Sequence, residues 1–303
     1  FATFGGFVGD FTLPMVMYED FHEPGSKELL AGFSIPAGQS GMEDVEDAVG
    51  HLADHPNTGP FIARRLIQRL VTSNPSRGYV ARVAGVFADD GEGRRGNLGA
   101  VVRAIFLDRE AREPTAPALA GHLREPFLRW VSLLRSFDAA SSSGRYLIDS
   151  NGVGFLLGQL PMSSPSVFNF FQPDFAPNGP VRDAGAVAPE FQVTTASTVA
   201  WLVALMTYFS FGDPAILLDP ALLKPDSITP EEMAIRLDLE EEIALAEDID
   251  ALIDRFDLMF TYGRLSDESR RVIRDVSEPL PPELRVPMVL HLLLITPDYA
   301  VVE

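Results

Sequence analysis

The chain has 303 residues and a formal net charge of −19 at pH 7, and 46% of its residues are hydrophobic. Such an acidic chain argues against nucleic acid as a partner, because binding phosphates requires a basic face. It contains no cysteine, which excludes disulfides, thiolate catalysis and cysteine-ligated zinc. No apolar run approaches the roughly 20 residues that a membrane-spanning helix needs, so we expect no transmembrane segment in this chain.

The first 40 residues contain scattered glycine and proline and little periodicity, which predicts an irregular segment. A helix is predicted next, beginning at Ser40 or Gly41 and ending before Pro56.

Residues 55–112 form the most regular stretch of the chain. Apolar residues three and four positions apart predict three helices there. Their predicted N-caps are Thr58, Asn74 and Asn97, residue types whose side chains accept hydrogen bonds from the first N–H groups of a helix. A further helix with a broad apolar face is predicted over residues 125–137.

Residues 138–197 are the least regular part, with dense glycine, proline, serine and asparagine between aromatic residues. The stretch is too apolar to be disordered, and irregular loops of this length are usually functional or packed against a core. We therefore expect an ordered irregular loop. Two helices are predicted after it, over residues 195–209 and, with an acidic composition, over residues 230–246.

The C-terminal stretch repeats the pattern of the central one. Helices are predicted over residues 249–260, 267–276 and 283–295, with a break after the first and a proline-containing loop after the second. The two tails align without a gap, with Glu110 matched to Asp298. We interpret this as a diverged internal duplication.

The predicted fold is therefore mostly α, with two related three-helix units joined by a long, ordered loop rich in aromatic residues and proline. Four parts are expected along the chain: an irregular N-terminal remainder (1–40), a first helical unit (41–137), the ordered loop (138–197) and a second helical unit (198–303).

Five blocks of sequence occur in a recognisable order: HPNTGPFIARRLIQRLVTSNPS, RGNLGAVVRAIFLDREAR, LREPFLRWVSLLRSF, LGQLPMSSPSVFNFFQPDF and VAPEFQV. Together they resemble the bacterial family called domain of unknown function 1800, from about residue 20 onwards. The resemblance implies that a helical N-terminal region of the family is missing from this chain. It also implies export to the periplasm or the cell exterior, although this chain shows no signal peptide. It implies no activity, because the family has no agreed one.

The histidines suggest one candidate metal site. His51 and His55 are four residues apart, a spacing that can hold one metal on a helix. Leu52 replaces the glutamate of the HExxH pattern, and Pro56 pushes His55 out of helical geometry. His22, next to Glu23 in the N-terminal loop, is a possible further ligand, and our candidate metal ligands are His22 and His55. In the alternative interpretation, His55 fastens the start of the next helix through a backbone hydrogen bond.

An acidic glycine-rich stretch, residues 89–93, lies between two predicted helices. A calcium loop of the EF-hand type needs a glutamate at its twelfth position, where this chain has Ala100. We interpret the stretch as a helix connector. The sequence also lacks a G-x-S-x-G motif and a phosphate-binding loop.

The irregular loop contains the best candidate binding site, because aromatic and amide side chains alternate in it. The candidate residues are Arg145, Tyr146, Phe168, Asn169, Phe170 and Gln172. Alternatively, the phenylalanines fill the core, and we expect at least three rings to be buried among Phe168, Phe170, Phe171, Phe175 and Phe191. One of Arg64 and Arg65 should face solvent, and the other should anchor the loop through its carbonyls or a carboxylate such as Asp174 or Glu190.

Apart from this loop, the sequence shows no complete set of catalytic residues. We therefore expect a non-enzymatic binding or assembly protein, exported, that acts with a protein or a glycan. One alternative is a hydrolase, with or without a metal, whose site lies near His22 and His55. Another is a structural subunit of a larger assembly. The sequence identifies no cofactor and leaves open whether the protein is an enzyme.

Overall fold

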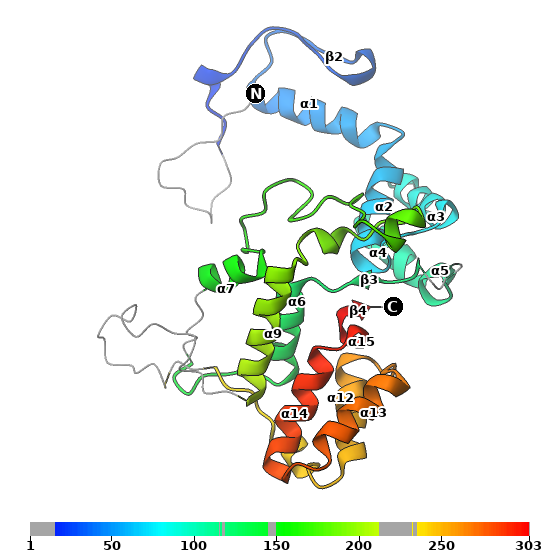
Figure 1. Ribbon diagram of the computed structural model, residues 1–303. Helices are drawn as coiled ribbons and strands as arrows, with labels where there is room; N and C mark the ends of the chain where they lie inside the picture. Colours follow the sequence, from blue (N-terminus) through cyan, green and yellow to red (C-terminus); the bar gives the residue numbers. More distant parts are fainter. Residues whose placement is uncertain are drawn as a thin grey trace. The chain divides into compact units, whose positions relative to one another are not determined.

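The computed structural model describes residues 16–114, 116, 119–144, 150–211, 232 and 235–302. This part of the chain is mostly helical, as predicted, and its strands form only two short antiparallel pairs (Figure 1). The chain divides into two compact units. Unit 1 comprises Phe1–Ile67 and Pro75–Glu113, and unit 2 comprises Gln68–Asn74 and Pro114–Glu303. In the described ranges, no helix has the length and apolar character needed to cross a membrane.

Unit 1 contains a short hairpin followed by helices. Tyr79 and Ile105 lie in its core, where α3 packs against α4 and the Tyr79 hydroxyl donates a hydrogen bond to the Ile105 carbonyl at 2.6 Å. The elements are η1 (Glu19–Phe21), β1 (Lys27–Glu28), η2 (Leu30–Gly32), β2 (Ser34–Ile35), α1 (Gly41–Asp54), most of α2 (Thr58–Leu70), α3 (Arg77–Ala88), α4 (Leu98–Leu107) and α5 (Arg109–Arg112).

Local sequence signals determine where these helices begin. At the start of α1, the Ser40 hydroxyl accepts from the Glu43 N–H, and the Glu43 carboxylate accepts from the Ser40 N–H, which together form a capping box. Asn97 caps α4, as predicted. The predicted cap of α3 is wrong, because Ser76 rather than Asn74 accepts the hydrogen bond from the first turn. Asn74 instead binds a distant segment of unit 2.

Unit 2 is built around α14, which packs against α9, α11, α12 and α13. Figure 1 shows α6 and α9 side by side, and these two helices are in contact. The elements are β3 (His122–Leu123), α6 (Pro126–Ser136), α7 (Ser150–Leu157), α8 (Pro180–Asp183), η4 (Pro189–Gln192), α9 (Ala196–Phe211), α11 (Glu240–Ala244), α12 (Ile249–Phe260), α13 (Asp267–Ser277), α14 (Pro282–Leu294), α15 (Pro297–Ala300) and β4 (Val301–Val302). Strand β3 pairs with β4.

The boundary between the units differs from the expected one. The helix predicted over residues 125–137 was assigned to the first helical unit, but α6 belongs to unit 2. The reason is its apolar face: Trp130 and Leu133 belong to the same buried cluster as Leu202 of α9 and Leu290 of α14. The short segment 68–74 also belongs to unit 2.

The acidic helix predicted over residues 230–246 is interrupted in the structure. Among its described residues, Glu232 and α11 are helical, whereas residues 235–239 are not. There, Arg236 and Ala140 exchange two backbone hydrogen bonds, of 2.8 and 3.0 Å, in an isolated antiparallel bridge. This pairing with a distant segment overrides the local helical preference of an acidic, proline-capped stretch.

The two stretches in which we predicted a duplication have the same order of elements, and each contains an equivalent hydrogen bond. In unit 1, the Ser76 hydroxyl that caps α3 donates to the Glu110 carboxylate on α5 at 2.6 Å. In unit 2, the Ser266 hydroxyl that caps α13 donates to the Asp298 carboxylate on α15 at 3.0 Å. The duplication stays a prediction, to which this shared bond adds a second feature.

The first testable prediction concerns the core of unit 2. Phe256 is fully buried on α12, so Phe256→Ala should lower the free energy of unfolding by about 3–5 kcal/mol. Leu258 on the same helix is 66% exposed, and Leu258→Ala is the matched control with little expected effect. Urea unfolding followed by tryptophan fluorescence reports on unit 2, because Trp130 and Trp201 are the only two tryptophans and both lie there. Equal effects of the two changes would contradict this core.

Candidate functional site

The candidate site lies in unit 2, in residues 161–195 between α7 and α9, which we call the aromatic segment. It contains only two short helical elements, α8 and η4. Its two arms are joined by backbone hydrogen bonds such as that from Ala188 N–H to the Phe175 carbonyl, 2.9 Å long. That residues 138–197 form an ordered loop stays a prediction.

Two amide side chains from the segment 68–74 hold the aromatic segment in place. The Asn74 side chain donates to the Val187 carbonyl at 2.9 Å and accepts from the Val187 N–H at 2.8 Å. The Gln68 side chain donates to the carbonyls of Pro173 and Ser73, at 3.1 and 3.0 Å. An amide group offers both donors and an acceptor, so Asn74 pairs with the backbone as a neighbouring strand would. These bonds fix the aromatic segment at two points.

A tight turn presents apolar side chains to solvent. The Asn169 N–H donates to the Ser166 carbonyl at 3.1 Å, and Asn169 adopts a φ of +74°, which asparagine tolerates better than most residues. The Phe168 N–H donates to the Ser166 hydroxyl at 3.1 Å. Val167 and Phe168 occupy the corners of the turn, where they are 95% and 37% exposed. Met162, earlier in the segment, is fully exposed.

The prediction that at least three of the five phenylalanine rings are buried is wrong. Phe171 is buried, Phe170 and Phe175 are half-buried, and Phe168 and Phe191 are exposed. Our argument assumed an extended chain, in which side chains alternate between two faces. The turn at Ser166–Asn169 breaks this alternation and directs one ring outward.

The other predicted binding residues have different outcomes. Arg145 and Tyr146 lie outside the described residues. Asn169 uses its backbone in the turn, and the Gln172 N–H donates to the Gln192 side chain at 2.7 Å. We named Phe191 as a ring of the loop but not as a candidate binding residue, and it is 40% exposed. Its place between two polar residues, Glu190 and Gln192, is the signal that could have added it to the candidates.

A polar cluster lies in the same unit, and it consists of the buried residues Glu125, Gln159 and Glu190 and of Arg69, whose side chain is 42% exposed. Arg69 forms an ion pair with Glu125, and the Gln159 side chain donates to the other Glu125 oxygen. Gln159 in turn accepts from the Phe127 N–H at 3.2 Å. Glu125 and Glu190 are 3% and 2% exposed. Burial raises the pKa of Glu190 to about 7, and a hydrogen bond from its own backbone and the nearby Arg69 charge oppose this rise only in part.

Arg69 is the arginine whose charge acts on Glu190, and anchoring of the loop by Arg64 or Arg65 stays a prediction. Arg64 is exposed, and Arg65 is half-buried with its guanidinium 5.5 Å from the centre of the Phe61 ring. This division between solvent and the edge of the apolar face agrees with the 100° rotation between consecutive helix residues.

The candidate metal ligands in unit 1 have separate partners. His22 Nε2 lies 2.6 Å from an Asp44 carboxylate oxygen, which also accepts from the Lys27 ammonium group at 2.6 Å. His55 Nδ1 accepts from the Asn57 N–H at 3.2 Å, just before α2, which is the fastening role of our alternative interpretation. Across the described part of the chain, no group of three or more histidine, aspartate or glutamate side chains could hold a metal ion.

The acidic connector before α4 uses its carboxylates within the loop. Asp89 accepts from the N–H groups of Gly91 and Gly93, at 2.8 and 3.0 Å. Asp90 accepts from the Asn97 side chain at 2.6 Å and from Arg94, and these bonds hold its pKa well below the usual range. Both side chains thus serve the connector that the sequence suggested.

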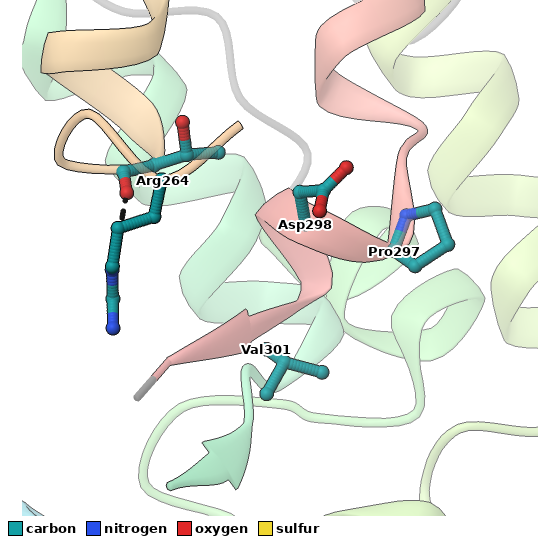
Figure 2. A pocket seen from close by; sticks show the side chains of 5 residues that line it. Arg264, Pro297, Asp298 and Val301 are labelled. Atoms are coloured by element: carbon teal, nitrogen blue, oxygen red, sulfur yellow. Dashed lines mark hydrogen bonds between the residues drawn. The ribbon is translucent and has the colours of Figure 1, made fainter. Parts of the chain in front are cut away.

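A small cavity of about 210 Å³ lies in unit 2 between the α12–α13 turn and the C-terminal elements (Figure 2). It is lined by Thr261, Arg264, Pro297, Asp298 and Val301. Arg264 donates to the Thr261 carbonyl at 3.4 Å, and Asp298 accepts from serine hydroxyls, so both charged groups already have partners. Ligand pockets are usually about 300–1,000 Å³ in volume, and we therefore place the candidate site in the aromatic segment.

The second testable prediction concerns the anchor of that segment. Asn74→Ala leaves the Val187 N–H and carbonyl without their partner, which should cost about 1–3 kcal/mol. Amide hydrogen exchange should show a loss of protection at Val187, while α12 stays protected. Asn178→Ala, at an exposed position of the same segment, is the control. Unchanged protection at Val187 in the Asn74 variant would refute the anchoring role.

Comparison with known proteins identifies the family. No curated protein and no solved structure matches the chain. A family model described as "Protein of unknown function (DUF1800)" matches residues 8–301, nearly the whole chain, and this match confirms the resemblance carried by the five sequence blocks. The chain belongs to this family.

Proposed function

We propose that the chain is a non-enzymatic binding protein and that its aromatic segment docks a protein partner. The observation that carries this proposal is the exposure of Val167 and Phe168 at the corners of a hydrogen-bonded turn. Single exposed apolar side chains are common on protein surfaces. Here, however, they accompany Met162 and Phe191 on one anchored segment.

The anchoring matters because a docking surface binds more tightly when it is ordered before the partner arrives. Each flexible side chain or loop that is immobilised on binding weakens the complex. In the aromatic segment, Asn74 and Gln68 hold the backbone, and the Gln192 side chain holds the Gln172 N–H. These bonds hold the backbone of the aromatic segment in the free chain, before a partner binds.

The chemistry of the exposed groups favours a protein over a glycan. Protein interfaces are enriched in methionine and aromatic residues and depleted of charge at their centre. Glycan sites need aromatic faces combined with hydrogen-bonding side chains, whereas Met162 and Val167 are aliphatic and expose no polar group. An apolar patch on the partner is the complementary surface.

The third testable prediction follows from this proposal. A photo-cross-linking amino acid at Val167, expressed in the source cells, should form an adduct with one protein. The same amino acid at Leu258, which is exposed on α12, is the matched control and should not form this adduct. With the partner purified, Phe168→Ala should weaken binding about tenfold or more, because aromatic contacts commonly dominate interfaces. The urea midpoint of this variant should be unchanged.

The alternatives give different results in the same experiment. An adduct within the chain means that its own residues cover the turn, and an adduct with a second copy means self-assembly; either outcome rejects a separate protein partner. If neither position forms an adduct and the chain binds oligosaccharides, the partner is a glycan.

A further inference from the structure

Glu190 is a buried carboxyl group with one unpartnered oxygen. Its side chain is 2% exposed, and its Oε2 atom has no hydrogen-bond partner within the described structure. A hydrogen bond from its own backbone and the charge of Arg69 both favour the ionised form, but the Arg69 side chain is 42% exposed and already forms an ion pair with Glu125. Two buried carboxylates thus share one guanidinium group. An ionised carboxylate that is buried without its own partner is strongly unfavourable.

The other charged groups of the neighbouring elements do not supply a second cation. Strand β3 packs against η4 and contributes His122, whose pKa is lowered mainly by burial and further by the charges of Arg69 and Arg124. His122 is therefore neutral near pH 7. Arg124 is directed elsewhere, because it donates to the Phe260 carbonyl at 3.1 Å and stacks against Tyr299. A proton on Glu190 is the remaining way to neutralise the cluster.

Glu190 is also connected directly to the docking surface. Its backbone carbonyl accepts from the Thr194 hydroxyl at 2.8 Å, which closes the turn of η4. The next residue is the exposed Phe191, and the one after it is Gln192, whose side chain holds the Gln172 N–H at 2.7 Å. If η4 leaves its position, Phe191 moves and the bond between the two arms of the segment is lost.

We propose that a proton on Glu190 controls the aromatic segment: the protonated carboxyl keeps η4 in its buried position, and the ionised carboxylate releases it. The control of partner docking by Glu190 rests on the proposed function. The effect of Glu190 protonation on the aromatic segment of the free chain does not rest on it.

The direction of the pH effect follows from proton linkage. We call the aromatic segment closed when η4 is in its buried position. The pKa of Glu190 is about 7 in this closed form, against an ordinary value of 4.5 when the carboxyl group is exposed. The closed form therefore holds the proton more tightly and loses stability as pH rises from about 4.5 through 7. Between pH 6 and 8, this difference increases the opening equilibrium constant about tenfold.

The fourth testable prediction uses amide hydrogen exchange on the full chain, expressed as protection factors that correct for the intrinsic effect of pH. Protection at the Gln172 and Val193 amides should fall about tenfold between pH 6 and 8. Glu190→Gln, which stays neutral, should abolish this fall. Asp174→Asn, at an exposed position of the same segment, should retain it.

A second measurement on the unaltered chain keeps the inference testable if Glu190→Gln does not fold. The carbon NMR signal of the Glu190 carboxyl should titrate near pH 7, in step with the loss of protection. Titration near pH 4.5, or a pH dependence that persists in Glu190→Gln, would overturn the inference.

Cross-linking at Val167 across the same pH range separates this inference from the proposed function. A pH-independent adduct leaves the docking function in place and rejects control by Glu190. A pH-dependent opening without any adduct supports the proton switch and rejects the docking function.

Discussion

The pairing of backbone groups with amide side chains is the constraint on which the aromatic segment depends. A segment without regular secondary structure must find other partners for the N–H and carbonyl groups that it buries. In unit 2, Asn74 and Gln68 supply these partners for Val187 and Pro173. Without them, the segment would have to leave these groups exposed to water, and its exposed side chains would have no fixed positions.

The same seven residues, 68–74, explain how one helix can belong to two units. The first part of α2 belongs to unit 1, whereas its last turn and the residues that follow belong to unit 2. Arg69 on that last turn forms the ion pair with Glu125, and the Ser73 N–H donates to the Gly121 carbonyl at 2.9 Å. These contacts assign residues 68–74 to unit 2.

The two units pair their carboxylates differently. In unit 1, the Arg82 guanidinium binds both oxygens of the mostly buried Asp108 at 2.7 Å, so that neither oxygen lacks a partner. In unit 2, Glu125 and Glu190 are buried beside a single arginine, which leaves Glu190 responsive to pH near neutrality. The acidic net charge of the chain does not reveal this difference, because it comes from burial and not from composition.

The sequence alone determined the elements whose signals are local. The predicted start of the first helix at Ser40 or Gly41 agrees with α1, and apolar periodicity predicted α12 with the bounds that the structure has, Ile249–Phe260. Only the tertiary structure decided the role of Asn74, whose partner Val187 is 113 residues away. The exposure of Phe168 and the pKa of Glu190 likewise depend on the tertiary structure. Burial depends on which distant segments cover a side chain, and helical periodicity carries no information about such segments.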